Sequence, residues 1–226
     1  MAENTTGKPL IKNKADTALL VIDMQKYQAG EEGNLPRYFG VINGPDAEKG
    51  AVSRGKEVVP IIRKLISAFR AAGASVVFTA FGSLTEDGAD LVPYVRLWNK
   101  KCREILGFPA IVSVHDPGYM ILPELSPLPN EPLVNKTAQG AFNSSVIDHV
   151  LRQRGINTIV AVGMYTNHCV MATCIGAADA GYRVIVPEDA VGSWNFDIHK
   201  RALDMMHSWV IRTSSDRLIK ELTSVS

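Results

Sequence analysis

The sequence predicts an α/β fold built on a parallel sheet. Three observations support this: six short apolar runs of strand length, helical patterns between them, and glycines where several of those helices end. Strands that alternate with helices through short turns form parallel sheets with right-handed crossovers. The chain of 226 residues is long enough for one such domain. We therefore expect a single domain over residues 1–226, with residues 1–14 as a flexible tail.

Residues 15–136 supply three strands and a long helix. Residues 18–22 (Ala-Leu-Leu-Val-Ile) form a continuous apolar run that ends at Asp23, as expected for a strand buried on both faces. Residues 52–72 carry apolar side chains at helical spacing, and Gly73 ends that helix. The next two strands are expected at residues 75–79 and 132–136.

The second half continues the alternation. Residues 158–162 (Thr-Ile-Val-Ala-Val) are uncharged and rich in β-branched side chains, which predicts a buried strand. Residues 170–180, rich in Ala and Met, predict the helix that follows it. The remaining elements expected are helices at 144–154, 197–207 and 214–222 and strands at 182–186 and 209–211.

Two stretches do not fit the alternation. Residues 28–50 are rich in Gly, Pro and charge, and residues 81–117 mix aromatic and cationic side chains without a clear period. Long irregular segments in a compact domain usually cover a functional site or contact another subunit. We expect one of these two roles for each stretch.

Composition excludes several classes of function. The formal net charge is +1, and no run of Lys and Arg predicts binding to nucleic acid or to an anionic membrane. The apolar runs are too short to span a bilayer, and no apolar segment follows the start of the chain as in a signal peptide. Three cysteines, an odd number, do not suggest a disulfide framework. We expect a cytoplasmic protein that binds neither nucleic acid nor membranes.

Three reactive side chains stand where predicted strands end: Asp23, Lys136 and Cys169. Carboxyl ends of parallel strands meet at one edge of a sheet, so the three side chains are expected in one crevice. Cys169 also begins a helix, where the helix dipole favours a thiolate, and a nearby lysine does the same. A carboxylate beside the thiol can act as general base and return the proton to an amine leaving group.

Each of these residues also has an ordinary explanation. An Asp after a strand often caps a helix, a Lys at a strand end is often solvated, and a Cys is often a small buried apolar residue. Their equivalent positions at three strand ends favour the catalytic interpretation.

Three motifs follow the strand ends in chain order. They are Val21-Ile22-Asp23-Met24-Gln25, then Asn135-Lys136-Thr137 with Gly140-Ala141-Phe142, then Gly163-Met164-Tyr165-Thr166-Asn167-His168-Cys169-Val170. Together they resemble the isochorismatase-like cysteine hydrolases, and the resemblance runs over roughly residues 15–215. That superfamily includes nicotinamidases, N-carbamoylsarcosine amidase, and biuret, triuret and ureidoacrylate hydrolases.

The resemblance implies a Rossmann-like three-layer sandwich with a parallel six-stranded sheet, assembled as homodimers or homotetramers. It implies Asp23 as general base, Lys136 as its electrostatic partner and Cys169 as nucleophile. It also implies a cis peptide bond between Met164 and Tyr165, which directs the N–H groups of Tyr165 and Cys169 into an oxyanion hole. No cofactor is implied.

Two departures from the family pattern bear on the substrate. Many relatives place an aromatic residue in the pocket where this chain has Gln28, which suggests a pocket less suited to a flat ring. Nicotinamidases carry metal-binding histidines after the second strand, whereas residues 78–83 contain none, so no metal site is expected. Cys169 argues against vinyl-ether hydrolysis, because true isochorismatases lack that cysteine.

Four residues are expected to bind substrate: Gln25, Gln28, Phe142 and Tyr165. The two glutamines are positioned to hydrogen-bond a polar chain. For Phe142, a pocket wall and a core aromatic remain equal alternatives. Other conspicuous residues receive lesser roles. We expect packing or a turn hydrogen bond for His168, packing for Cys174, and either binding of a substrate carboxylate or plain solvation for Arg96 and Arg103.

We expect a cofactor-independent amidohydrolase that cleaves a small linear amide or ureide through a Cys169 acyl-enzyme. Biuret, triuret, ureidoacrylate and N-carbamoyl compounds are the substrates considered. A nicotinamidase-like amidase and a binding module with a vestigial triad are the alternatives.

Overall fold

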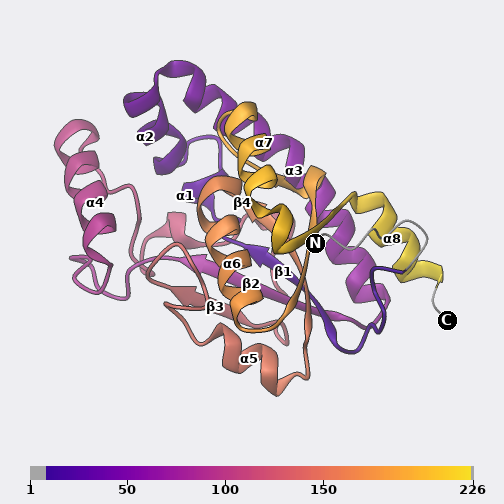
Figure 1. The fold of residues 1–226 in the computed structure, drawn as a ribbon. Helices are drawn as coiled ribbons and strands as arrows, with labels where there is room; N and C mark the ends of the chain where they lie inside the picture. Colours follow the sequence, from indigo (N-terminus) through magenta and orange to yellow (C-terminus); the bar gives the residue numbers. More distant parts are fainter. Residues whose placement is uncertain (1–8, 225–226) are drawn as a thin grey trace.

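The computed structural model describes residues 9–224 as a three-layer α/β structure with the sheet in the middle (Figure 1). Six parallel strands follow the order β3-β2-β1-β4-β5-β7. A seventh, β6, has two residues and pairs with the end of β4. The strands are β1 (Thr17–Ile22), β2 (Ser75–Phe81), β3 (Leu133–Lys136), β4 (Thr158–Met164), β5 (Arg183–Pro187), β6 (Val191–Gly192) and β7 (Val210–Thr213). The α/β class and the six-stranded parallel sheet are confirmed.

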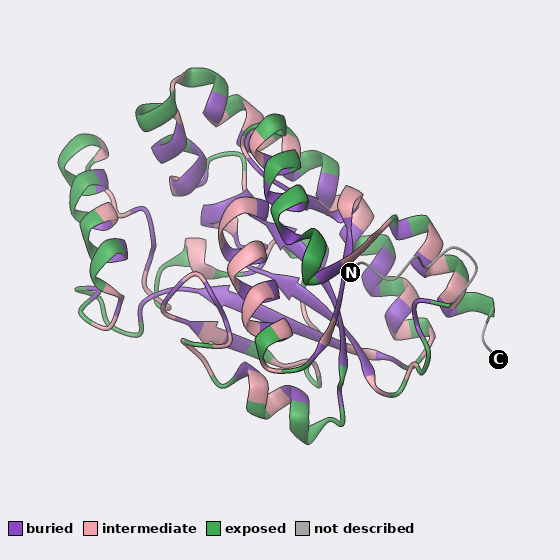
Figure 2. Ribbon diagram, viewed as in Figure 1, coloured by how far each residue is buried: buried purple, intermediate pink, exposed green. Residues whose placement is uncertain are grey.

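Helices cover both faces of the sheet. On one face, α3 (Pro45–Ala71) packs against α8 (Ser215–Ser224) and the central strands. On the other lie α5 (Ile147–Gln153) and α6 (Met171–Asp179), and α7 (Phe196–Met205) packs near the turn that follows β4 (Figure 1). Every residue of β1 and β4 is buried, as their uncharged sequences predicted, and the exposed positions gather on the helices (Figure 2).

The two stretches expected to be irregular contain helices. They form α1 (Lys26–Ala29), α2 (Asn34–Asn43) and α4 (Pro93–Leu106), and α3 begins at Pro45 rather than at residue 52. Prolines stand at the start of α3 and α4, where a missing N–H costs nothing. The expectation of loops was wrong because the glycines, prolines and cations mask a helical period: α4 buries Val95, Asn99 and Cys102.

The start of the described chain also differs from expectation. Leu10 and Ile11 are buried, and their N–H groups donate to Glu221 on α8 at 2.6 and 2.9 Å. Within the segment expected to be a flexible tail, Leu10 and Ile11 therefore pack against the domain, whereas residues 1–8 lie outside the described residues. Between residues 9 and 224, no helix has the length and apolar character needed to cross a membrane.

Candidate active site

The sheet order brings the three predicted reactive side chains together. Asp23 follows β1, Cys169 lies in the turn after the neighbouring β4, and Lys136 ends β3, two strands from β1. The Lys136 side chain crosses the end of β2, with its Nζ 4.1 Å from the centre of the Phe81 ring. Asp23 and Lys136 are fully buried, and Cys169 is 4 % exposed.

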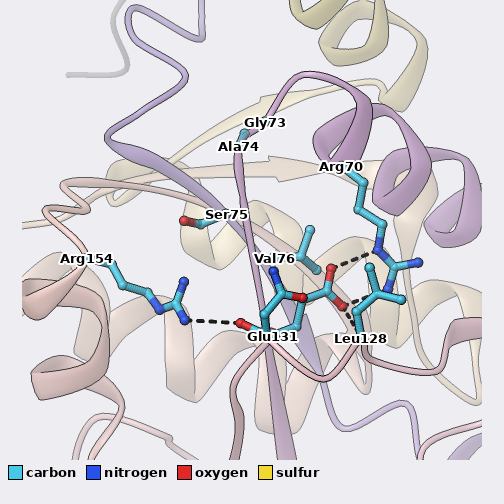
Figure 3. A pocket seen from close by; sticks show the side chains of 9 residues that line it. Arg70, Gly73, Ala74, Ser75, Val76, Leu128, Glu131 and Arg154 are labelled. Atoms are coloured by element: carbon cyan, nitrogen blue, oxygen red, sulfur yellow. Dashed lines mark hydrogen bonds and ion pairs between the residues drawn. The ribbon is translucent and has the colours of Figure 1, made fainter.

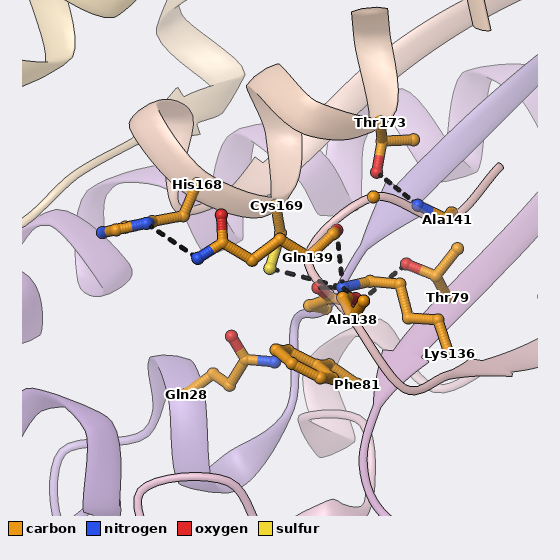
Figure 4. A network of polar contacts seen from close by, with 12 residues as sticks. Gln28, Thr79, Phe81, Lys136, Ala138, Gln139, Ala141, His168, Cys169 and Thr173 are labelled. Atoms are coloured by element: carbon orange, nitrogen blue, oxygen red, sulfur yellow. Dashed lines mark hydrogen bonds and ion pairs between the residues drawn. The ribbon is translucent and has the colours of Figure 1, made fainter. Parts of the chain in front are cut away.

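Lys136 is the centre of the polar network (Figure 4). Its Nζ lies 2.8 Å from Asp23 Oδ2 and donates to Cys169 Sγ at 3.3 Å. It also donates to the carbonyl oxygens of Ala138 and Gln139, both at 2.9 Å. Burial by itself would lower the pKa of Lys136, but the charge of Asp23 and the hydrogen bonds with Asp23 and Cys169 outweigh burial and raise it. The ammonium form is therefore the stable one.

Asp23 is held from two sides. Thr79 Oγ1 donates to Oδ1 at 2.7 Å, which leaves Oδ2 to face Lys136. The backbone of Asp23 has a φ of 53°, a conformation that Asp and Asn adopt more readily than other side chains. Strand end, threonine and lysine together fix the direction of this carboxylate.

The surroundings of Cys169 favour its thiol form over the thiolate. Burial raises the pKa of Cys169 above that of an ordinary thiol, and Asp23 adds to the increase through its charge and a hydrogen bond, while Lys136 opposes it. Burial therefore acts against the expected resting thiolate more strongly than Lys136 acts for it. Asp23 is the carboxylate that hydrogen-bonds this thiol.

The backbone before Cys169 has an unusual form. The peptide bond between Met164 and Tyr165 is cis, as the resemblance implied. The Tyr165 carbonyl accepts from the N–H groups of His168 and Val170, and its hydroxyl donates to the carbonyl of Gln28. These contacts fix the turn that carries Cys169.

A small cavity adjoins the thiol. Its volume is about 10 Å³, on the order of one water molecule, so a substrate enters only when lining side chains move. Its lining comes from five parts of the chain and consists of Gln28, Leu35, Phe39, Phe81, Trp98, Ile111, Gln139, Tyr165, His168 and Cys169. The helices α2 and α4 that the sequence did not predict therefore form part of the cavity wall. The i, i+4 spacing of Leu35 and Phe39 was the available signal for α2.

The four predicted substrate-binding residues have different surroundings. Gln28 and Tyr165 line the cavity. Gln25 is fully buried, and both its amide oxygen and its amide nitrogen are bonded to protein groups. Phe142 does not line the cavity but packs on Tyr182, with ring centres 5.4 Å apart.

His168 lines the cavity rather than serving only as packing. Its ring is stacked on Phe39, lies edge-on to Trp98, and has Nδ1 3.2 Å from the side-chain nitrogen of Gln139. Burial lowers the pKa of His168 to about 4, so the ring is neutral near pH 7. On α4, Arg96 and Arg103 are exposed and do not line the cavity.

Another pocket lies at the amino end of β2, away from Cys169 (Figure 3). It has a volume of about 280 Å³, and Arg70 and Glu131 form an ion pair at 2.7 Å within it. Its other lining residues include no cysteine or histidine. Among residues 9–224, no group of three His, Cys, Asp or Glu side chains is arranged to hold a metal ion.

Comparison with known proteins extends the resemblance seen in the sequence. The isochorismatase domain family matches residues 17–215. The ureidoacrylate amidohydrolase RutB of Stutzerimonas stutzeri is 31 % identical over 191 residues, covering 81 % of this chain and 72 % of that protein. RutB of Yersinia enterocolitica is 27 % identical and covers 93 % and 91 %.

Solved structures agree with the fold. A cysteine hydrolase from Pseudomonas syringae superposes with a TM-score of 0.78 at 24 % identity, covering 95 % of each chain. N-carbamoylsarcosine amidase from Thermoplasma acidophilum superposes with a TM-score of 0.63 at 26 % identity, covering 89 % of this chain and 97 % of the other.

Proposed function

Because the chain belongs to the isochorismatase family, we propose that it is a cysteine amidohydrolase that cleaves a C–N bond of a small linear amide or ureide. The observation that carries the proposal is the buried contact of Lys136 Nζ with both Asp23 and Cys169, at 2.8 and 3.3 Å. The names of the RutB relatives and of N-carbamoylsarcosine amidase support the same class of bond.

The first half of the reaction forms an acyl-enzyme. Asp23 takes the proton from the Cys169 thiol, and the sulfur bonds to the carbonyl carbon of the substrate. The carbonyl oxygen becomes an oxyanion, which the N–H groups of Tyr165 and Cys169 stabilise. The C–N bond then breaks while Asp23 returns the proton to the leaving nitrogen, and ammonia or an amine departs.

The second half releases the acid. Asp23 removes a proton from water as the oxygen bonds to the thioester carbon. The C–S bond then breaks, the acid departs, and Asp23 returns the proton to the sulfur, which regenerates the thiol and the carboxylate. Lys136 remains an ammonium throughout and stabilises the carboxylate whenever Asp23 is unprotonated. The raised pKa of Cys169 agrees with this scheme, because deprotonation then accompanies attack instead of preceding it.

An ammonia-release assay over small amides and ureides tests the proposal. Cys169→Ala is expected to lower kcat by about 10⁴-fold or more, the scale seen when a nucleophile is removed. Cys174→Ala is the matched control, because Cys174 is also buried but lies one turn along α6, outside the cavity. Ammonia from nicotinamide with bound zinc or iron would instead support a nicotinamidase. A protein that binds these compounds without turnover would be a binding module.

We further propose a cytoplasmic homodimer or homotetramer. Three free cysteines support a reducing compartment, and the exposed apolar residues of α2 and α4, which include Val41, Ile42 and Leu97, support an interface. Light scattering on the purified protein measures the assembly, and a monomer at micromolar concentration contradicts it.

A further inference from the structure

Backbone hydrogen bonds fix the orientation of the Gln25 side-chain amide, and Gln25 in turn fixes the orientation of the Gln28 amide. The Gln25 Nε2 donates to the carbonyl oxygens of Phe81 and Tyr119 at 3.2 and 2.8 Å, and its Oε1 accepts the Phe81 N–H at 2.7 Å. Backbone groups cannot exchange donor and acceptor, so they fix which end of Gln25 is oxygen. The Gln28 Nε2 in turn donates to that oxygen at 2.9 Å. The oxygen of Gln28 must therefore point the other way.

That oxygen is an unused acceptor beside the nucleophile. Gln28 is fully buried and lines the same cavity as Cys169, and its Oε1 has no hydrogen-bond partner within residues 9–224. Figure 4 shows the amide oxygen turned toward the side on which Gln139 and Cys169 lie. Buried acceptors without partners are rare because they cost free energy, so this atom is suited to receive a donor from a bound molecule.

The cavity has no positive charge to offer an anion. Its described lining contains no Arg or Lys, and its one histidine, His168, is neutral near pH 7. Lys136 lies behind the lining with its charge balanced by Asp23. Five of the lining side chains are aliphatic or aromatic: Leu35, Phe39, Phe81, Trp98 and Ile111. A carboxylate buried among them would lose its hydration without gaining a cation.

We propose that Gln28 determines specificity by accepting a hydrogen bond from a substrate N–H next to the scissile carbonyl, and that the substrate is uncharged. This inference rests on the proposed function, and it separates neutral ureides from ureido acids such as ureidoacrylate, the compound for which the RutB relatives are named. Gln25 acts as a positioning residue, because it holds the Gln28 amide in the accepting orientation.

Three compounds of nearly equal size test the proposal. They are (3-hydroxypropyl)urea, which is neutral and has one cleavable carbonyl, 3-ureidopropanoate, which carries a carboxylate in place of the alcohol, and 1-(3-hydroxypropyl)-1-methylurea, which lacks the N–H on the side of the carbonyl away from the leaving NH2. We expect kcat/KM for the neutral ureide to exceed that for the carboxylate by about 100-fold. We expect it to exceed that for the N-methyl compound by about 10- to 100-fold.

Gln28→Met tests the residue itself, because methionine keeps the length and removes the acceptor. The variant is expected to lose the preference for N–H over N-methyl while retaining its rejection of the carboxylate. Gln153→Met, an exposed residue of α5, is the control and should keep both preferences. An equal or better rate with the carboxylate, or an unchanged N–H preference in Gln28→Met, would overturn the proposal.

Binding to Cys169→Ala, measured by calorimetry, separates this inference from the proposed function. Tight binding of the neutral ureide and weak binding of the carboxylate, without turnover by the wild-type enzyme, would support the specificity and refute the chemistry. Failure of the neutral ureide both to bind and to react would overturn the specificity proposal. Cys169-dependent hydrolysis of the carboxylate in preference would refute the specificity alone.

Discussion

Removing Lys136 should destabilise the protein more than any surface change. In Lys136→Met the Asp23 carboxylate keeps Thr79 but loses its cation, while both positions are fully buried. Breaking a buried ion pair from one side typically costs about 3–5 kcal/mol, because the remaining charge is uncompensated. With a total stability on the order of 5–15 kcal/mol, the variant should fold with a clearly reduced urea midpoint.

A double-mutant cycle shows whether the loss comes from the pair. Asp23→Asn is the suitable partner change, since Asn also tolerates the positive φ of that position. In Asp23→Asn with Lys136→Met neither of these two positions carries a charge, so the double variant should be about 2–3 kcal/mol more stable than the sum of the single losses predicts. The assay is urea unfolding at pH 7, followed by circular dichroism.

Lys101→Met, an exposed change on α4, is the control and should alter the free energy of unfolding by less than about 0.5 kcal/mol. A loss below about 1 kcal/mol for Lys136→Met, or single losses that simply add, would refute the reasoning about the buried pair.

Three further predictions concern the backbone, stability against pH, and the thiol. Gly163→Ala should lower the free energy of unfolding in urea by about 2–5 kcal/mol, because Gly163 has a φ of +126° and an added Cβ would lie 2.1 Å from the Ile22 carbonyl oxygen. Gly73→Ala is the control: its added Cβ meets open space, and it should lower the free energy of unfolding by about 1 kcal/mol. In the folded protein, burial lowers the pKa of His168 from its ordinary value of 6.5 to about 4. The stability that the neutral ring contributes is therefore complete above pH 6.5 and is lost as the pH falls toward 4. The free energy of unfolding of His168→Asn should consequently fall less than that of wild type between pH 7 and 4.5. Burial raises the pKa of Cys169, so Cys169 should not form a thiolate between pH 6 and 8.5. The difference in absorbance at 240 nm between wild type and Cys169→Ala should therefore stay constant over that range. A rise in this difference would show a thiolate and contradict a neutral resting thiol.

The sheet and the convergence of polar side chains could be predicted from the sequence because both follow from local pattern. Uncharged runs such as 158–162 have one stable arrangement in an α/β domain, and the residue after each strand necessarily lies at the same edge of the sheet. The position of Asp23 follows from that rule alone, whereas that of Cys169 depends also on the turn that follows β4.

The cavity could not be predicted in the same way. Its wall depends on how α2 and α4 pack over the sheet edge, which is set by tertiary contacts such as the paired hydrogen bonds between Asn99 and the backbone of Ile111. The difference between Gln25 and Gln28 has the same origin. Only the three-dimensional network shows that the Gln25 amide is bonded at both ends and that the Gln28 oxygen has no partner in the described part of the chain.

The proposed reaction requires an intermediate in which the substrate acyl group is bound covalently to Cys169. Rapid-quench mass spectrometry detects this intermediate directly. The enzyme is mixed with an ureide from which it releases ammonia, stopped with acid within milliseconds, and digested. We expect the peptide containing Cys169 to gain the mass of the substrate acyl group before steady state, and we expect Cys169→Ala to show neither the adduct nor turnover. Turnover at the wild-type rate in Cys169→Ala, or an acyl group on Cys174 instead, would contradict the proposed reaction.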